Sequence, residues 1–115
     1  MDDEPAVRDL TVEILRRSGY EPRGAPTARQ ALDLLDEEQF DLVVSDVMMP
    51  EMTGVEFLYE LRLRQPDQRV ILMTGGSEEP ERTTKAVELG AASLLYKPFS
   101  HAELNAAVAT ALESD

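Results

Sequence analysis

Three short apolar runs in this chain each end on a polar side chain that can do chemistry. The runs at 42–45, 70–73 and 92–96 end on Asp46, Thr74 and Lys97 respectively. Parallel strands present their chemistry just past their carboxyl ends, so these three groups are expected to meet at one rim of a sheet. Asp46 taken alone would be an ordinary residue of a turn. Its combination with a hydroxyl and an ammonium group favours a functional site.

Two further acids, Asp2 and Asp3, stand directly before the first expected helix. Carboxylates that converge repel one another, and a divalent cation that accepts their oxygens removes this penalty. A set of oxygen ligands without His or Cys suits Mg²⁺ or Mn²⁺ rather than zinc. With Lys97 neutralising phosphate oxygens and Thr74 donating to another, the set predicts phosphoryl transfer with Asp46 as the nucleophile.

Helices and strands alternate in the pattern of apolar residues that must position this site. Helical spacing predicts helices over 6–18, 28–35, 55–64, 78–89 and 101–112. Besides the three apolar runs, the segment 20–26 predicts a short edge strand, since its two prolines are tolerated mainly at an edge. Gly19 is expected to end the first helix, and Thr27 and Ser100 to cap later ones. This alternation predicts an α/β fold, a doubly wound parallel sheet with helices on both faces.

Length and charge restrict the classes of function. A chain of 115 residues is about one domain. Its net charge of −12 opposes direct binding to nucleic acid or to an anionic membrane surface. The chain has no cysteine and no apolar run near the roughly 18 residues that cross a bilayer. A cytoplasmic location is therefore expected, with any nucleic-acid role supplied by a partner.

Five strings of residues, in this order and spacing, carry a resemblance to a known family. They are Asp-Asp-Glu-Pro at 2–5, Val-Val-Ser-Asp-Val-Met-Met-Pro at 43–50, Thr-Gly at 53–54, Ile-Leu-Met-Thr-Gly at 71–75 and Tyr-Lys-Pro-Phe-Ser at 96–100. Over nearly its whole length the chain resembles the receiver domain of two-component response regulators. The resemblance implies a flavodoxin-like arrangement of the predicted elements.

The resemblance also implies a role for each site residue. Asp46 would take a phosphoryl group from a histidine kinase or phosphotransfer protein, and Thr74 and Lys97 would sense it. Magnesium would be held by Asp3, Asp46 and the backbone carbonyl of Met48. Asp2 would support the metal without binding it directly. Such a domain is a switch that changes its affinity for a downstream effector protein, and it is not a turnover enzyme.

The chain departs from the family pattern in two places. Receivers usually carry an aromatic residue three positions before the lysine, where this chain has Leu94. The nearest aromatic, Tyr96, is expected on another face or in another register. A readout by rotation of an aromatic ring at position 94 is therefore excluded.

The second departure concerns the strand that receivers place before the acidic pair, in the middle of the sheet. Here Met1 directly precedes Asp2, so we expect residues 1–115 to form an N-terminally shortened receiver whose first strand is missing or replaced. An unfilled central position would leave buried backbone groups unpaired, at about 1–3 kcal/mol each. The sheet is expected to close up to four strands, or a neighbouring chain to contribute a strand in a homodimer or strand-exchanged dimer.

Two other functions compete with the phosphorylated switch. A degenerate receiver would act as a constitutive protein-binding or dimerisation module. A phosphatase with an aspartate nucleophile has the right residue at a strand end, but the acid expected two positions on is replaced by Met48, and no cap that would enclose a substrate is present. The phosphatase is the weakest of the three hypotheses.

Overall fold

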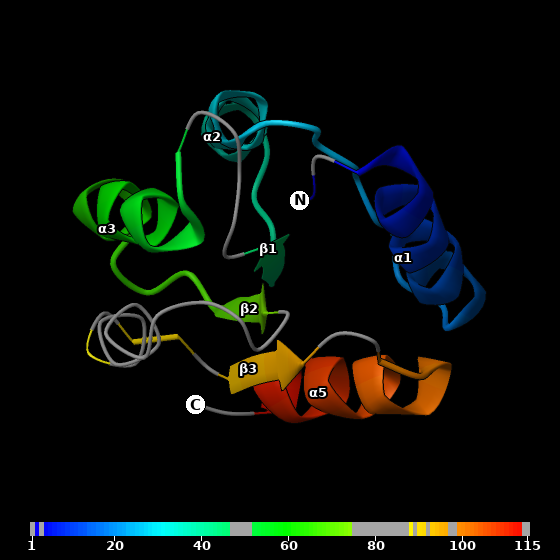
Figure 1. Cartoon of the computed structure of the whole chain (residues 1–115). Coiled ribbons are helices and arrows are strands. Elements are labelled where there is room, and N and C mark those ends of the chain that lie inside the picture. The colour runs from blue at the N-terminus through cyan, green and yellow to red at the C-terminus, as the bar shows by residue number, and fades with distance from the viewer. Residues whose placement is uncertain are drawn as a thin grey trace.

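The computed structural model describes residues 2, 4–46, 52–74, 88, 90–91, 93–96 and 99–113. Its helices and strands alternate largely as the apolar pattern predicts (Figure 1). The elements are α1 (Pro5–Arg17), α2 (Ala28–Glu37), β1 (Val43–Asp46), α3 (Gly54–Arg64), β2 (Val70–Thr74), β3 (Ser93–Tyr96) and α5 (His101–Glu113). Glu88 is helical, and the rest of the helix predicted at 78–89 lies almost wholly outside the described residues.

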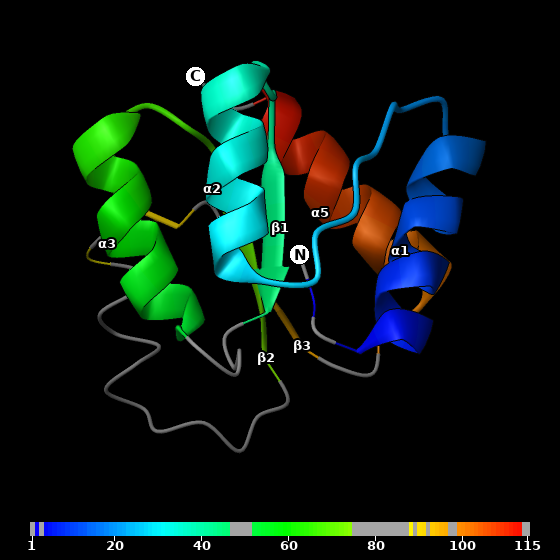
Figure 2. The same cartoon turned by 90° about the horizontal axis from the view of Figure 1, so that it is seen from above.

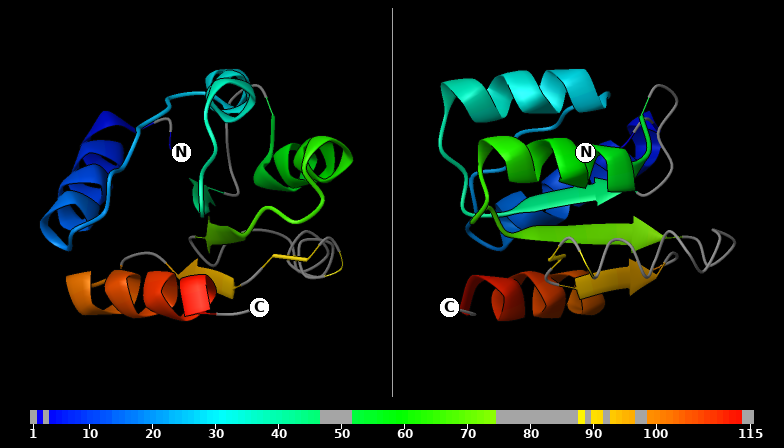
Figure 3. Two further views of the ribbon diagram at one scale, coloured as in Figure 1. Left: turned by 180° about the vertical axis from the view of Figure 1, so that it is seen from behind. Right: turned by 90° about the vertical axis from the view of Figure 1, so that its left-hand side faces the viewer.

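The three described strands form one parallel sheet in the order β1-β2-β3, and their arrows point the same way in the right-hand view of Figure 3. Residues Val43 to Asp46 of β1 pair in order with Val70 to Met73 of β2. Residues 71–74 of β2 pair in order with Ser93 to Tyr96 of β3. All three strands therefore end at the same edge, as the position of the predicted site requires.

Helices cover both faces of this sheet, which confirms the doubly wound α/β prediction. One core lies between the sheet and the helices α2 and α3, and includes Leu32, Leu35, Phe57, Leu58, Leu61 and Leu72. The other lies between the sheet and the helices α1 and α5, and includes Ile14, Ile71, Met73, Leu95, Leu104 and Val108. β2 is covered on both sides: all five of its residues are buried, as expected for a central parallel strand.

Local capping sets the helix starts. The Thr27 hydroxyl accepts the backbone N–H three residues on, at 3.2 Å, as predicted. Ser100 and Glu103 cap α5 reciprocally, each side chain accepting the other's N–H at 3.0 Å. Thr53 and Glu56 form the same capping box at the start of α3, satisfying backbone donors that a helix start otherwise leaves unpaired.

The edge strand predicted at 20–26 is wrong. The connection from α1 to α2 is an open loop without strand pairing (Figure 2). Gly19 does end α1 in the left-handed region, with φ of 95°. Pro22 and Pro26 lack the N–H that a ladder needs, and no strand of the described sheet lies beside this loop to pair with it.

The sheet of the described residues leaves the outer side of β1 open. A cavity of about 800 Å³ lies between β1 and the loop 20–25, lined by Val43 and Val44 on one side and by the loop on the other. The expectation of a sheet closed to four strands is therefore wrong for the part of the chain that the structure describes.

Candidate functional site

Asp46 is the last residue of β1 and is 6% exposed. The residue before it, Ser45, is fully buried, and its hydroxyl donates to the backbone carbonyl of Asp46 at 3.1 Å. An acid buried at a strand end requires hydrogen-bonding or charged partners, because a buried carboxylate without them is costly. Asp46 is therefore a buried acid at a strand end rather than an exposed turn residue.

Thr74 ends the neighbouring strand and is 3% exposed. Because Asp46 pairs with Met73, Asp46 and Thr74 are one residue step apart on adjacent strands. With strands about 4.8 Å apart and a rise of about 3.3 Å per residue, their Cα atoms are about 6 Å apart. The backbone thus brings the predicted carboxylate and hydroxyl to one edge of the sheet.

Lys97 lies outside the described residues, as do Asp3 and Met48. Tyr96, the residue before Lys97, ends β3 in register with Thr74. The chain therefore passes the same edge of the sheet directly before Lys97. The roles expected of Lys97, Asp3 and Met48 stay predictions.

Asp2 is 1% exposed, and its position is fixed by contacts to both neighbouring segments. Its side-chain Oδ1 accepts the backbone N–H of Glu4 at 3.0 Å. Its own backbone N–H donates to the carbonyl of Ala25 at 3.2 Å. The start of the chain lies beside the end of β1 in both Figure 1 and Figure 2. Asp2 therefore supports the start of α1, where an acid is favoured by the helix dipole in any protein.

Arg8 is a contributor that the sequence interpretation missed. Its Nη1 donates to the backbone carbonyl of Asp2 at 3.0 Å, across the first turn of α1. In a sequence, a basic residue six positions after an acid gives little indication that the two residues are in contact. Only the turn of the chain into α1 brings the two together, so Arg8 acts as a positioning residue for Asp2.

The donor set of the described residues suits a hard cation without defining a complete metal site. Asp2 and Asp46 offer carboxylate oxygens, the ligands that Mg²⁺ and Mn²⁺ prefer. Among the residues that the structure describes, no three His, Cys, Asp or Glu side chains are grouped to hold a metal ion. Completing the set would require Asp3 and the carbonyl of Met48.

β3 ends with Tyr96, the aromatic residue nearest to position 94. Leu94 packs against the core under α2 and α3, whereas Leu95 is buried in the core beside α5. Side chains two residues apart on a strand share a face. Tyr96 therefore lies on the same face as Leu94 but in another register, beside Thr74 rather than Leu72, which is one of the two placements expected for it. It is 58% exposed.

Among the described residues outside this site, Arg62 has a shifted pKa. Burial lowers the pKa of the Arg62 guanidinium, and the charge of Asp67 opposes that shift. Arg62 donates to the backbone carbonyls of Gln68 and Gly90. It thereby links the end of α3 to the segments that precede β2 and β3.

Comparison with known proteins identifies the family to which this fold and site belong. Residues 1–109 match the response regulator receiver domain. A crystal structure of a response regulator receiver domain protein (CheY-like) from Methanospirillum hungatei JF-1 is 30% identical, with a TM-score of 0.92 over 97% of this chain and 89% of that one. The receiver domain of NtrX from Brucella abortus also gives a TM-score of 0.92 at 30% identity, over 99% of this chain and 96% of that one. The chain belongs to the response regulator receiver domain family, a class of signalling domain.

Relatives with named functions extend this assignment. Sporulation initiation phosphotransferase F of Bacillus subtilis is 35% identical over 94% of this chain and 86% of its own length. The alkaline phosphatase synthesis transcriptional regulatory protein PhoP of the same organism is 36% identical over 94% of this chain, which spans 45% of that protein. The chain thus corresponds to less than half of PhoP and to most of the phosphotransferase. No helix in the described part of the chain is long and apolar enough to cross a membrane.

Proposed function

We propose that this receiver domain accepts a phosphoryl group on Asp46 from a histidine kinase or phosphotransfer protein. A carboxylate oxygen of Asp46 attacks phosphorus, and the bond from phosphorus to the donor breaks. The observation that carries the proposal is the burial of Asp46 at the end of β1, one residue step from the buried Thr74. An acid and a hydroxyl so close together can contact the same phosphoryl group.

Each further residue of the site has a distinct role in the proposal. Thr74 donates its hydroxyl to a phosphate oxygen, and Lys97 neutralises the charge of another. Bound by Asp3, Asp46 and the carbonyl of Met48, Mg²⁺ or Mn²⁺ would supply positive charge to the transferring oxygens. Asp2, held by Glu4 and Arg8, keeps the acidic segment against the end of β1.

The phosphorylated form is proposed to change the affinity of the domain for a downstream effector protein. Tyr96, the residue before Lys97 in the sequence, is exposed and places an aromatic side chain on the surface at the end of β3. A net charge of −12 argues against direct binding to nucleic acid. We propose a cytoplasmic location, where kinase and effector partners of this family would be met.

Intact-protein mass spectrometry tests the phosphoacceptor directly. The chain is incubated with acetyl phosphate and Mg²⁺, and we expect a mass increase of one phosphoryl group. Asp46→Asn should abolish the increase, because an amide is a poor nucleophile and cannot form the acyl phosphate. Asp41→Asn is the matched control, since Asp41 is an exposed acid just before β1.

The outcomes separate the two main hypotheses. A mass increase that is retained in Asp41→Asn and lost in Asp46→Asn supports the phosphorylated switch. No increase in the unmodified chain, with the fold intact by circular dichroism, would favour the degenerate receiver that binds partners constitutively. An increase that survives in Asp46→Asn would place the phosphoacceptor elsewhere.

A further inference from the structure

Ser45 places a hydroxyl group inside an otherwise apolar core. It is fully buried, and its register partner on β2 is the fully buried Leu72. Val43, two residues earlier on the same face of β1, packs against the core under α2 and α3, to which Leu72 belongs. A buried hydroxyl is costly unless it is hydrogen-bonded, and an apolar side chain would fill this position without that cost. Packing alone therefore does not account for a hydroxyl at this position.

The hydroxyl of Ser45 donates to the backbone carbonyl of the next residue, Asp46, at 3.1 Å. Along a parallel strand, the backbone N–H and C=O of one residue point to one side, and those of the next residue point to the other side. The N–H of Val43 donates to the carbonyl of Arg69, directly before β2, at 2.9 Å. By this alternation Ser45 directs its backbone groups toward β2, and Asp46 directs its own away from β2.

The Ser45 hydroxyl thus acts at the point where the pairing of β1 with β2 ends. Asp46 is the last residue of β1, so no later residue of the strand fixes rotation about the bond between its Cα and its carbonyl carbon. The hydrogen bond from Ser45 to the Asp46 carbonyl restricts this rotation, which is the torsion ψ of Asp46. The rotamers open to a side chain depend on φ and ψ of its own residue. The Ser45 hydroxyl therefore limits the orientations of the Asp46 carboxylate.

We propose that Ser45 is a positioning residue for the phosphoacceptor. Its hydroxyl holds the carbonyl of Asp46, and thereby keeps the carboxylate in the orientation from which an oxygen attacks phosphorus. Ser45 acts only through Asp46, because successive side chains of a strand project to opposite faces of the sheet. The inference rests on the function proposed above and adds a residue to it.

Substitutions at position 45 separate the hydroxyl from the packing. Ser45→Ala removes the hydroxyl, whereas Ser45→Val and Ser45→Thr introduce side chains of similar shape, of which only threonine keeps a hydroxyl. Each variant is incubated with acetyl phosphate and Mg²⁺, and intact-protein mass spectrometry follows the rate of phosphoryl uptake. Ser45→Ala should be slower than the unmodified chain by about three- to tenfold, the factor that one hydrogen bond is worth. Ser45→Thr should be faster than Ser45→Val by a similar factor.

Two further measurements distinguish positioning from a general loss of stability. Urea unfolding gives the free energy of unfolding of each variant. The NMR resonance of the Asp46 backbone carbonyl carbon reports the hydrogen bond without any phosphate. It should move in Ser45→Ala and Ser45→Val, and should return toward its original position in Ser45→Thr.

Ser18→Ala is the matched control. It removes another serine hydroxyl that donates to a backbone carbonyl, that of Ile14, at 3.1 Å. This bond lies at the end of α1, so its loss should change neither the rate of phosphoryl uptake nor the Asp46 resonance.

The outcomes separate this inference from the function on which it rests. Rates that follow the presence of the hydroxyl, and not the free energy of unfolding, support the positioning role. Equal rates in all variants, or rates that follow stability, would overturn that role while leaving Asp46 as the phosphoacceptor. If the larger valine and threonine side chains prevent folding, Ser45→Ala decides the question through its rate and its Asp46 resonance. An unmodified chain that takes up no phosphoryl group would overturn the proposed function and the positioning role together.

Discussion

β1 and β2 are neighbouring parallel strands, yet the structure buries their apolar residues to different degrees. All five residues of β2 are buried. In β1 the valines Val43 and Val44 are only half-buried, whereas Ser45 and Asp46 are buried. β2 has a strand on each side, whereas on its outer side β1 faces the cavity. Burial of a strand thus depends on its neighbours as much as on its own sequence.

The helices show the same contrast. On the closed side of the molecule α2 and α3 are linked to each other, and on the open side α1 faces β1 across the cavity. α2 and α3 are joined at their ends by Gln65, whose Nε2 donates to the carbonyl of Leu35 at 3.0 Å, and by an ion pair of Arg64 with Asp36 at 2.9 Å. α1 contacts α5, where the Ser18 hydroxyl donates to Asn105 at 2.8 Å. Toward β1, however, α1 borders the cavity. The open side therefore has less packing for a substitution to disturb.

The largest difference is expected between two valines that are register partners. Val70 of β2 is fully buried, and Val43 of β1 is its half-buried partner. Val70→Ala should lower the free energy of unfolding by about 2 kcal/mol, because two buried methyl groups are lost and a cavity is left. Val43→Ala should cost less than about 1 kcal/mol, since its side chain is already incompletely covered.

Urea unfolding of both variants measures this difference. An unchanged slope of the free energy of unfolding against urea concentration would confirm that both variants expose the same surface on unfolding. Equal losses would mean that β1 is packed as tightly as β2 and would contradict the contrast.

Local features of this fold could be predicted from sequence, because they depend on residues within one helical turn. The caps at Thr27 and Ser100 and the left-handed exit at Gly19 all formed as expected. The positions of Asp46 and Thr74 at adjacent strand ends were also predictable, since parallel strands share one carboxyl edge.

Features that depend on distant parts of the chain could not be predicted. The loop 20–26 has a composition compatible with an edge strand, and it pairs with no described strand because none lies beside it. The contact of Arg8 with the carbonyl of Asp2 depends on how the chain turns into α1. The walls of the open cavity come from α1, α2, α5, β1 and the loop 20–25, segments that lie far apart in the sequence.

A smaller effect is expected from Arg62, which reinforces the closed side. Its guanidinium donates to the carbonyls of Gln68 and Gly90. Arg62→Met keeps the apolar stem of the side chain but removes both donors, so it should lower the free energy of unfolding by about 1–2 kcal/mol. Thermal and urea unfolding measure the loss. Arg16→Met is the control on the open side, where the side chain is largely exposed, and a loss as large as that of Arg62→Met would contradict the proposed role of the two carbonyls.

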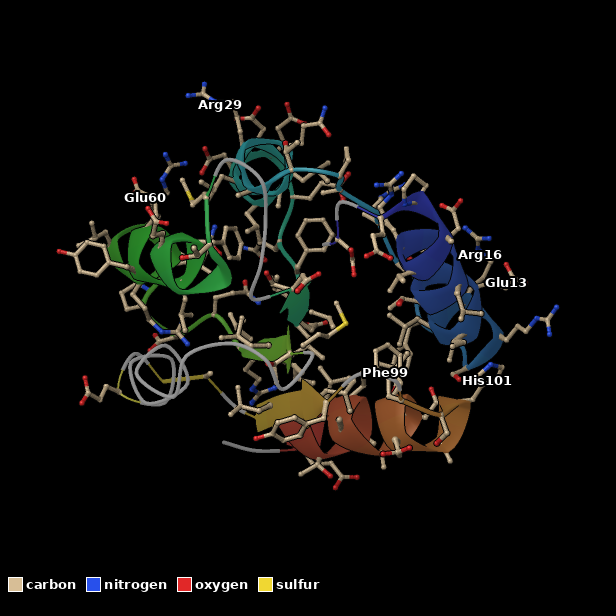
Figure 4. The ribbon with its side chains drawn as sticks, in the orientation of Figure 1. Glu13, Arg16, Arg29, Glu60, Phe99 and His101 are labelled. Carbon is tan, nitrogen blue, oxygen red and sulfur yellow. The ribbon has the colours of Figure 1, made fainter. Side chains whose placement is uncertain are left out.

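The smallest effect is expected on the outer surface of α1, where Glu13 pairs with Arg16 at 3.3 Å and with Arg17 at 3.0 Å. Figure 4 shows Glu13 and Arg16 on the side of the helix that faces away from the sheet. Exposed pairs of this spacing are worth about 0.3–0.5 kcal/mol and are screened by salt. Glu13→Gln should therefore lower the free energy of unfolding by no more than about 0.5 kcal/mol, and the loss should vanish in concentrated sodium chloride. A larger loss that persists in salt would mean that Glu13 stabilises α1 by packing rather than by charge, and that the open side is more tightly held than its cavity indicates.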